Sequence, residues 1–225
     1  MAVAEIIHFP STSTNENSAD DRIQKAIQAL KKVENPQHCV LGTQILDRSA
    51  IQITSEWDGI EDYLNFSTTP EFSSFIRSVG NLFGEPRNIF HVALDSPAFG
   101  PNGPATANVV EFVQVYFPAS RVTPDFEKQI EADFSRFEGI FRRAANGDVG
   151  LALGWVVEEQ EHGDITDEKA KCFFVVRGWE SMDLFEQSIK HDAYKEAIPL
   201  LLAWNVPFTM WHVERRALGG SEMVA

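Results

Sequence analysis

Cysteine is nearly absent from this chain of 225 residues, which contains only Cys39 and Cys172. Two cysteines cannot form a disulfide framework or a cysteine-rich zinc site, and the sequence predicts no metal centre. The alternative is a site in the acidic stretch 158–171, where His162 lies near Asp164, Asp167 and Glu168. Such a run of charges is more typical of a solvated loop.

Basic residues are also few. The chain has 19 Lys and Arg residues against 33 Asp and Glu residues, so its formal net charge is -14. A protein that binds nucleic acid needs a basic surface to neutralise phosphates, and an anionic membrane surface repels an acidic protein. We therefore expect neither a nucleic acid nor a membrane as a partner.

Long apolar runs and targeting signals are missing too. No apolar run approaches the ~20 residues that a membrane-spanning helix needs. The first residues, "MAVAEIIHFPSTSTNENSADD", have no basic region followed by a long apolar region, which is what a secretory signal peptide requires. The expected location is cytoplasmic.

Sequence motifs for nucleotides, metals and nucleophilic serine are not found. The chain has no P-loop, no dinucleotide-binding glycine fingerprint, no HExxH and no GxSxG. No cofactor is therefore expected. Any chemistry must depend on acid and base side chains, on the shape of a cavity, or on a reactive substrate that meets oxygen directly.

What the chain does contain is an internal repeat. The segment "EWDGIEDYLNFSTTPEF" (56–72) has the same pattern as "GWESMDLFEQSIKHDAY" (178–194), with Trp57 matching Trp179. A stretch rich in proline and glycine separates the two copies. We predict a first repeat over residues 1–95, a linker over 96–107 and a second repeat over 108–225.

Further matches extend over both repeats. Each opens with a β-rich run that ends in Phe-Pro, and this ending aligns His8 with Tyr116. The later matches are Gly42 with Gly154 and His91 with His212. Each repeat then has the order β-α-β-β-α-β, the ferredoxin-like unit with helices on one face of an antiparallel sheet. The prediction is an α+β fold in which two tandem units bury their bare sheet faces against each other, as a barrel within one chain.

At these residues the chain resembles the dimeric α/β-barrel superfamily, and particularly its antibiotic biosynthesis monooxygenase branch. "WESMDLFEQSIKHDAYKEAI" matches the family pattern W-[DE]-S-x-[DE]-x-F, and "WDGIEDYLNFSTTPEFSSFI" follows it in the same register. The resemblance implies a small-molecule enzyme without a cofactor. Family members usually dimerise, whereas this chain looks like a pseudo-dimer, which could itself form a further homodimer.

The resemblance can be carried over position by position. Haem-degrading members have Trp nine residues and His nineteen residues after the motif Trp, where this chain has Phe66 and Ile76, then Ser188 and Ile198. Haem degradation is therefore not expected. Polyketide-cyclising members have Tyr at the ninth position and His at the fifteenth. This pair is absent as such, and only the second repeat, with Ser188 and Tyr194, has polar side chains at both positions.

The candidate site therefore lies in the second repeat. Tyr116, Tyr194 and His212 are the predicted catalytic residues, since tyrosine and histidine can exchange protons or bind an enolate oxygen. The predicted substrate-binding residues are Trp179, Ser188, His191, His8, His91 and Trp57. Because the first and last strands of each unit are neighbours, His8 could approach His91, and Tyr116 could approach His212. The alternatives are tryptophans that only pack the strand–helix corner, and histidines that are hydrogen-bonded inside the barrel.

Two functions from different classes follow. The first is an enzyme that acts on a hydrophobic, aromatic or polyketide-like molecule by cyclisation, isomerisation or oxygenation. The second is a non-catalytic small-molecule-binding or stress-related protein. The more apolar first repeat, with Phe66 and Phe72 at the equivalent positions, suggests at most one working pocket.

Overall fold

The computed structural model describes residues 2–10, 16–30, 36 and 38–219, without the side chains of 16–20 and 217–219. The first repeat contains β1 (Val3–Phe9), α1 (Glu16–Leu30), β2 (His38–Gln44), β3 (Ile51–Trp57), α2 (Ile60–Ser67), α3 (Pro70–Phe83) and β4 (Asn88–Leu94). The second contains β5 (Val109–Pro118), α4 (Pro124–Phe141), β6 (Asp148–Val156), β7 (Gln160–His162), β8 (Ile165–Trp179), α5 (Met182–Lys190), α6 (Asp192–Leu202) and β9 (Phe208–Gly219). Short 3-10 turns occupy Pro104–Thr106 and Ala119–Arg121.

Both repeats have the predicted ferredoxin-like order. In the first, β1 lies between β3 and β4, and β2 lies outside β3. In the second, β5 lies between β8 and β9, and β6 lies outside β8. All of these pairs are antiparallel. The strand β7 is an addition that pairs only with β8, so it extends the acidic hairpin of the second repeat.

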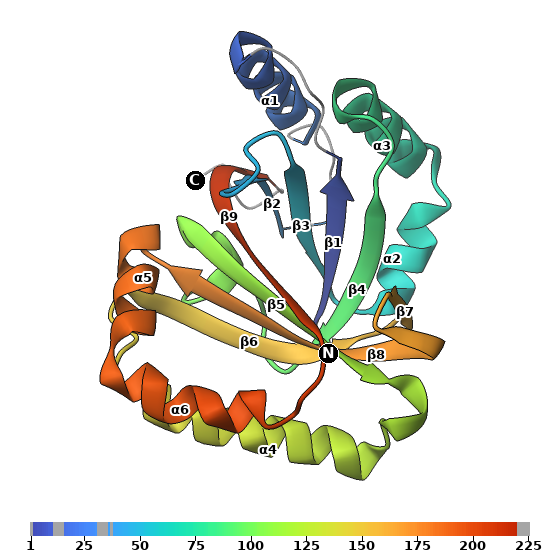
Figure 1. Cartoon of the computed structure of the whole chain (residues 1–225). Coiled ribbons are helices and arrows are strands. Elements are labelled where there is room, and N and C mark those ends of the chain that lie inside the picture. Colours follow the sequence, from blue (N-terminus) through green and yellow to red (C-terminus); the bar gives the residue numbers. More distant parts are fainter. Residues whose placement is uncertain (1, 11–15, 31–35, 37, 220–225) are drawn as a thin grey trace.

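The two sheets join into one closed barrel. The edge strand β4 pairs with β6, and the edge strand β2 pairs with β9. Figure 1 shows β9 leaving the second repeat to lie beside β2 of the first. Because every edge of one repeat pairs with an edge of the other, eight strands form a barrel without an open edge. The α+β fold and the pseudo-dimer within one chain are confirmed; the boundaries at 95 and 107 stay a prediction.

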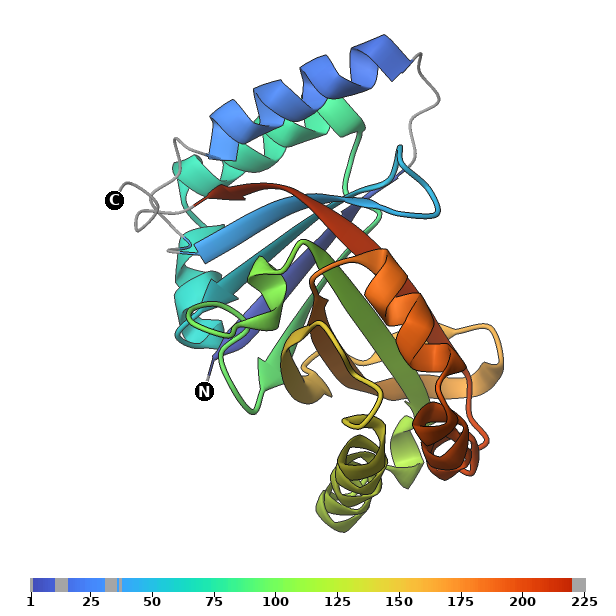
Figure 2. The ribbon, with the colours of Figure 1, turned by 90° about the vertical axis from the view of Figure 1, so that its left-hand side faces the viewer.

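Helices cover the barrel on two opposite sides. In Figures 1 and 2, α1 and α3 lie against the sheet of the first repeat, and α4 and α6 lie against the sheet of the second. The described residues form four buried apolar clusters: one inside the barrel, one under each pair of helices, and a small one around Val3, Trp57 and Phe66. No helix of the described ranges is long and apolar enough to cross a membrane.

One predicted alignment is wrong. Val3 pairs with Trp57, and Val109 pairs with Trp179 in the same way, so the first strands correspond with an offset of 106 residues. His8 therefore corresponds to Gln114 and not to Tyr116. The reason is that β5 has ten residues and β1 has seven, so Phe-Pro ends β5 two residues later than the equivalent position.

Glycine is needed where the repeats join. A Cβ atom on Gly154 would lie 2.0 Å from the carbonyl oxygen of Ala93 in β4, and one on Gly42 would lie 2.2 Å from Cγ1 of Val213 in β9. These are the two glycines that the sequence comparison aligned. Each lies in a strand that pairs across the junction, so the close approach of the two backbones accounts for both.

Gly154→Ala should destabilise the chain, because backbone atoms at this junction cannot move aside as a flexible side chain could. We expect the free energy of unfolding to fall by about 1–3 kcal/mol, as for other overpacked positions. Urea unfolding followed by circular dichroism measures this change.

Gly139→Ala in α4 is the control. Gly139 is an exposed helical glycine, and a Cβ atom placed on it would have open space around it. Alanine should therefore stabilise the chain by about 0.5–1 kcal/mol. Equal effects of the two substitutions would show that close packing at the junction does not require glycine.

Candidate functional site

Each repeat buries a glutamate that accepts a hydrogen bond from the motif tryptophan. Trp57 Nε1 donates to Glu5 Oε2 over 3.1 Å, and Trp179 Nε1 donates to Glu111 Oε2 over 2.8 Å. Glu5 lies in β1 and Glu111 in β5, both on the face of the sheet that the helices cover. The tryptophans therefore have a structural partner in both repeats, which supports the interpretation that they position the strand–helix corner.

A histidine lies opposite each glutamate across a strand pair. His91 pairs with Glu5, and His212 pairs with Glu111. An aromatic ring from the helix that follows the motif tryptophan covers each imidazole: Tyr63 lies 4.0 Å from His91, and Phe185 lies 4.2 Å from His212, measured between ring centroids. The duplicated chain thus contains two copies of one Glu–His–Trp arrangement.

The two copies differ in what reaches the histidine. His91 of the first repeat is reached by Glu158, which comes from the second repeat. Glu158 Oε1 lies 2.5 Å from His91 Nδ1, and Glu158 Oε2 accepts a hydrogen bond from the His91 backbone. Burial alone would raise the pKa of Glu158, but the hydrogen bonds from His91 outweigh it and lower that pKa. Because Gly42 corresponds to Gly154, the equivalent of Glu158 is Leu46, which is 95% exposed. No carboxylate from this position reaches His212.

His212 is consequently a neutral, buried base. Its Nε2 atom is buried and has no hydrogen-bond partner among the described residues. Burial lowers the pKa of His212 to about 4, because a charged imidazolium is poorly solvated there.

The second repeat contains a large cavity between its sheet and the helices α4, α5 and α6. This cavity has a volume of about 690 Å³, within the range of small-molecule sites. The equivalent space in the first repeat, beside Glu5 and Trp57, has a volume of only about 10 Å³, because Phe66, Phe72 and neighbouring apolar side chains fill it. The first repeat has other hollows, of about 690 Å³ between α1 and α3 and of about 470 Å³ beside Trp57 and α2. The expectation of a single working pocket therefore stays a prediction.

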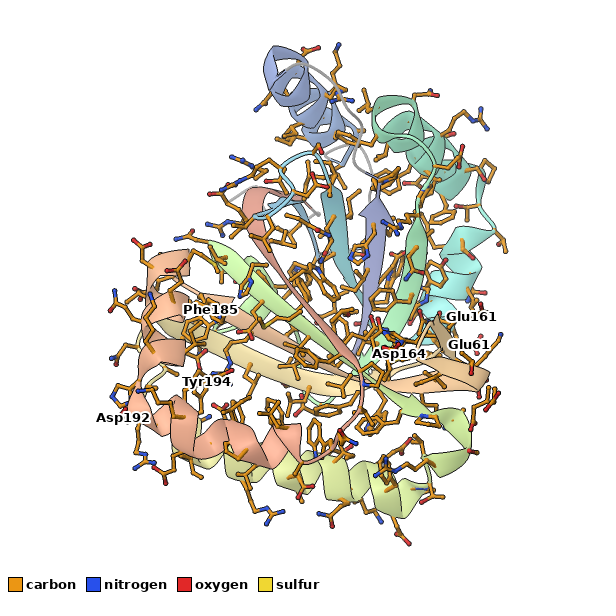
Figure 3. The ribbon with its side chains drawn as sticks, in the orientation of Figure 1. Glu61, Glu161, Asp164, Phe185, Asp192 and Tyr194 are labelled. Atoms are coloured by element: carbon orange, nitrogen blue, oxygen red, sulfur yellow. The ribbon has the colours of Figure 1, made fainter. Side chains whose placement is uncertain are left out.

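The walls of the cavity are mainly aromatic and aliphatic, with a few polar groups. Phe134, Phe137 and Phe141 come from α4, Phe185 from α5 and Tyr194 from α6. Figure 3 shows Phe185 and Tyr194 on the side where α5 and α6 face the sheet, and Asp192 at the outer surface. The polar groups that line the cavity are Glu111, Asp164, Arg177, Tyr194 and Asn205.

Two of these polar groups have perturbed acidities. Burial raises the pKa of the Glu111 carboxyl, although the Arg177 charge and the Trp179 indole oppose this change. Burial, and then the negative charge of Glu111, raise the pKa of the Tyr194 hydroxyl. Tyr194 is therefore protonated at neutral pH and can donate a hydrogen bond into the cavity, and Glu111 can exchange a proton with a bound molecule.

Two predicted juxtapositions are wrong. His8 lies inside the barrel, where its Nε2 is 3.0 Å from Gln52 Oε1 and its ring contacts Trp211, whereas His91 faces the helices. Tyr116 also lies inside the barrel, with its hydroxyl 3.2 Å from that of Thr209, on the opposite face of the sheet from His212. Side chains alternate between the two faces of a strand, and His8 and Tyr116 are three and five residues from the glutamates that pair with His91 and His212, so they lie on the other face.

The remaining predicted residues have structural roles or lie beside the cavity. Ser188 is 1% exposed and donates to the Phe185 carbonyl oxygen. His191 is exposed and caps α6, with Nδ1 accepting from the Ala193 backbone. Neither residue lines the cavity, and only Tyr194 of the predicted set does so. His212 lies behind Phe185, whose ring contacts the imidazole and also lines the cavity.

The acidic hairpin does not gather metal ligands. Glu168 accepts hydrogen bonds from the backbone and hydroxyl of Ser120, and His162 accepts one from the Asp164 backbone. Within the described ranges, no group of three or more His, Cys, Asp or Glu side chains is placed to hold a metal ion.

Sequence reasoning missed the glutamates. Glu5 and Glu111 are single carboxylates within otherwise apolar strands, "AVAEIIHF" and "VVEFVQVYF". A buried carboxylate at equivalent positions of both repeats was a usable signal. The Phe-Pro alignment hid this signal, because it displaced one strand by two residues relative to the other.

Comparisons with known proteins agree with this fold. The structure is similar to that of an anthrone oxidase-like protein, with a TM-score of 0.61 and 12% identity, over 100% of this chain and 96% of that chain. It is also similar to two structures described as "putative monooxygenase". The one from Fusobacterium nucleatum has a TM-score of 0.59 and 12% identity, over 98% of this chain and 94% of that chain. The one from Lactobacillus acidophilus has a TM-score of 0.58 and 10% identity, over 97% and 96%.

No protein-family model matches the chain, and no curated protein matches it significantly in sequence. At such low identities the structural matches show the fold alone. The predicted resemblance to dimeric α/β barrels of the monooxygenase-like kind is thus confirmed as a likeness of fold, with two units fused in one chain.

The buried His212 should make stability depend on pH. Between about pH 6.5 and 4 the unfolded chain binds a proton at His212 that the folded chain does not bind, so the free energy of unfolding falls as pH falls. His212→Gln removes this contribution. The stability difference between the original chain and the variant should therefore shrink on acidification, by at most about 1.4 kcal/mol per pH unit.

Urea unfolding of both proteins from pH 7 to 4 measures this difference. Glu111 is present in both, so its own titration cancels to a first approximation. The pKa of the ring can also be measured directly by NMR. A His212 ring that titrates near pH 6.5 would contradict the neutral, buried state described here.

Proposed function

We propose that this chain is an enzyme that acts on a small hydrophobic molecule, aromatic or polyketide-like, bound in the cavity of the second repeat. The reaction class is cyclisation, isomerisation or oxygenation assisted by acid and base side chains. The single observation that carries the proposal is the difference between the two repeats. The same sheet–helix space is filled in the first and is a cavity of about 690 Å³ in the second.

The lining of the cavity supports a hydrophobic ligand. Aromatic and aliphatic side chains form most of its surface, and the few polar groups can orient a ligand. The structural neighbours include proteins described as anthrone oxidase-like and as monooxygenases. Their names are consistent with chemistry on small organic molecules in a barrel of this kind.

Tyr194 and Glu111 are the side chains that we assign to proton exchange. Both line the cavity, and the charge of Glu111 affects the Tyr194 hydroxyl. Tyr194, which holds its proton at neutral pH, would donate a hydrogen bond to a carbonyl or enolate oxygen of the ligand. Glu111 would accept or return a proton, since a carboxyl with a raised pKa is suited to general acid–base catalysis.

His212 has a supporting place in this scheme. It lies directly across the β5–β9 pair from Glu111, and Phe185 stands between its ring and the cavity. We therefore propose that the neutral imidazole of His212 forms part of the surroundings of the Glu111 carboxyl and does not contact the ligand. Tyr116, which is inside the barrel, has no role in the proposed reaction.

A non-catalytic binding protein is the alternative. The observation that favours it is the burial of His212, a predicted catalytic base whose ring contacts Phe185 and does not line the cavity. This alternative requires the same ligand cavity but no turnover. Measurements of binding and of turnover on the same compounds separate the two functions.

Tyr194→Phe tests the enzymatic proposal. The chain is incubated with anthrones, phenols and linear poly-β-ketones in air, and products are followed by liquid chromatography and mass spectrometry. On any compound that is turned over, the variant should lower kcat/KM by roughly 100-fold, because it removes the proton donor and keeps the ring.

Tyr116→Phe and Tyr63→Phe are the matched controls. Each removes one partly buried tyrosine hydroxyl, in the barrel interior and in the first repeat respectively, and each should keep kcat/KM within about twofold. If Tyr194→Phe behaves like these controls, the assignment of Tyr194 is wrong. If compounds bind in the cavity but none is converted, the binding function is correct.

A further inference from the structure

A group of charged side chains lies at one end of the cavity around Arg177. This arginine is 2% exposed and lies in β8. Its Nη1 atom donates to Asp148 Oδ2 over 2.7 Å, and its Nη2 atom donates to Glu138 Oε2. Its charge also acts on Glu111. One guanidinium therefore lies among three carboxyl groups, which we call the Arg177 cluster.

Both terminal nitrogens of Arg177 already donate to carboxylates of the protein, which reduces the positive charge that a bound anion would meet. An arginine recognises a carboxylate through two parallel N–H donors, and here carboxylates already occupy both terminal nitrogens. The guanidinium also lies 5.1 Å above the ring of Phe141 and 5.8 Å from that of Trp179. Carboxylates and aromatic rings of the protein thus already interact with the positive charge at this end of the cavity.

The fold does not require the Arg177 cluster. The position equivalent to Arg177 in the first repeat is Ser55, whose hydroxyl donates to Glu5 over 2.7 Å. The first repeat therefore forms the same strand with a small neutral side chain, and its sheet–helix space is filled. The charged cluster occurs where the cavity occurs, which points to a role in what the cavity binds.

The rest of the lining adds no positive charge. Among the described residues that line the cavity, Arg177 is the only basic one, while Glu111 and Asp164 are acidic. His212 behind Phe185 is neutral, since burial lowers its pKa to about 4. Burial also raises the pKa of Glu111 and of Asp148, because a negative charge is poorly solvated at this end of the cavity. A bound anion would meet the same cost.

We propose that the Arg177 cluster makes this cavity selective for uncharged apolar molecules and excludes carboxylates of the same shape. This inference rests on the proposed function, because it concerns the ligand of the same cavity, and it narrows the substrate class to neutral compounds. A carboxylate would lose its hydration on entry, and the one cation among the described residues that line the cavity already has two carboxylates of the protein as partners. A neutral carbonyl or amide loses much less hydration free energy on entry, and its oxygen can accept a hydrogen bond from the Tyr194 hydroxyl.

Binding of two matched probes tests the proposal. The uncharged 2-naphthamide and the anionic 2-naphthoate have nearly the same shape, and both are small relative to the cavity. Dissociation constants for the full chain are measured by isothermal titration calorimetry at pH 7 and constant ionic strength. We expect 2-naphthamide to bind at least tenfold more tightly than 2-naphthoate.

Glu138→Gln should weaken this selectivity through Arg177. The substitution keeps the shape of the side chain and removes one of the charges that neutralise the guanidinium. We expect the dissociation constant of 2-naphthoate to fall at least fivefold, with that of 2-naphthamide changed by less than twofold.

Glu131→Gln is the control for the overall charge. Glu131 is an exposed residue two turns earlier in α4, where it accepts a hydrogen bond from the Trp155 indole, and glutamine can replace it as an acceptor. The net charge of the chain changes by the same amount as in Glu138→Gln. This control should leave both dissociation constants unchanged within twofold.

The outcomes separate this inference from the proposed function. Equal binding of the two probes to the original chain, or equal effects of the two substitutions, would overturn the inference and leave the cavity as a ligand site. If neither probe binds, both the inference and the ligand cavity of the proposed function are overturned. Selective binding supports the inference whether or not any compound is turned over.

Discussion

The pairing of sheet edges between the two repeats is the constraint on which the rest of the structure depends. A single ferredoxin-like unit leaves two edge strands unpaired and one face of its sheet bare. In this chain β4 pairs with β6 and β2 pairs with β9, and the closed barrel buries both bare faces in one core. Because the barrel supplies that core, the outer faces of the two sheets can diverge. One is filled by its helices and the other keeps a cavity.

Divergence after duplication is clearest at the paired glutamates and histidines. Both repeats keep the tryptophan–glutamate hydrogen bond and the histidine opposite the glutamate. His91 of the first repeat is contacted by Glu158, which comes from the second repeat, and by the ring of Tyr63. At His212 of the second repeat, the equivalent positions are Leu46, which comes from the first repeat, and Phe185. Arg177 stands where the first repeat has Ser55.

Much of the architecture could be predicted because it depends on local pattern. The repeated Trp-acid motif, the matched glycines and the strand–helix order reveal two units, and Gly42 and Gly154 indeed mark where the repeats join. The candidate site was less predictable. Tyr194 lies on the cavity, yet Tyr116 and His8 face the barrel interior, since a strand places adjacent residues on opposite faces. The polar groups of Ser188 and His191 serve the helices themselves: Ser188 donates a hydrogen bond to the Phe185 carbonyl oxygen, and His191 caps α6.

The sequence by itself determined the fold class and the duplication, because periodicity, turns and aromatic positions are properties of neighbouring residues. Only the tertiary structure decided which groups share a site. Glu111, Glu138, Asp148 and Arg177 come from two strands, a helix and the start of another strand. The contact of Glu158 with His91 joins residues 67 positions apart, from different repeats. Such contacts depend on how the barrel closes, and no local pattern specifies that closure.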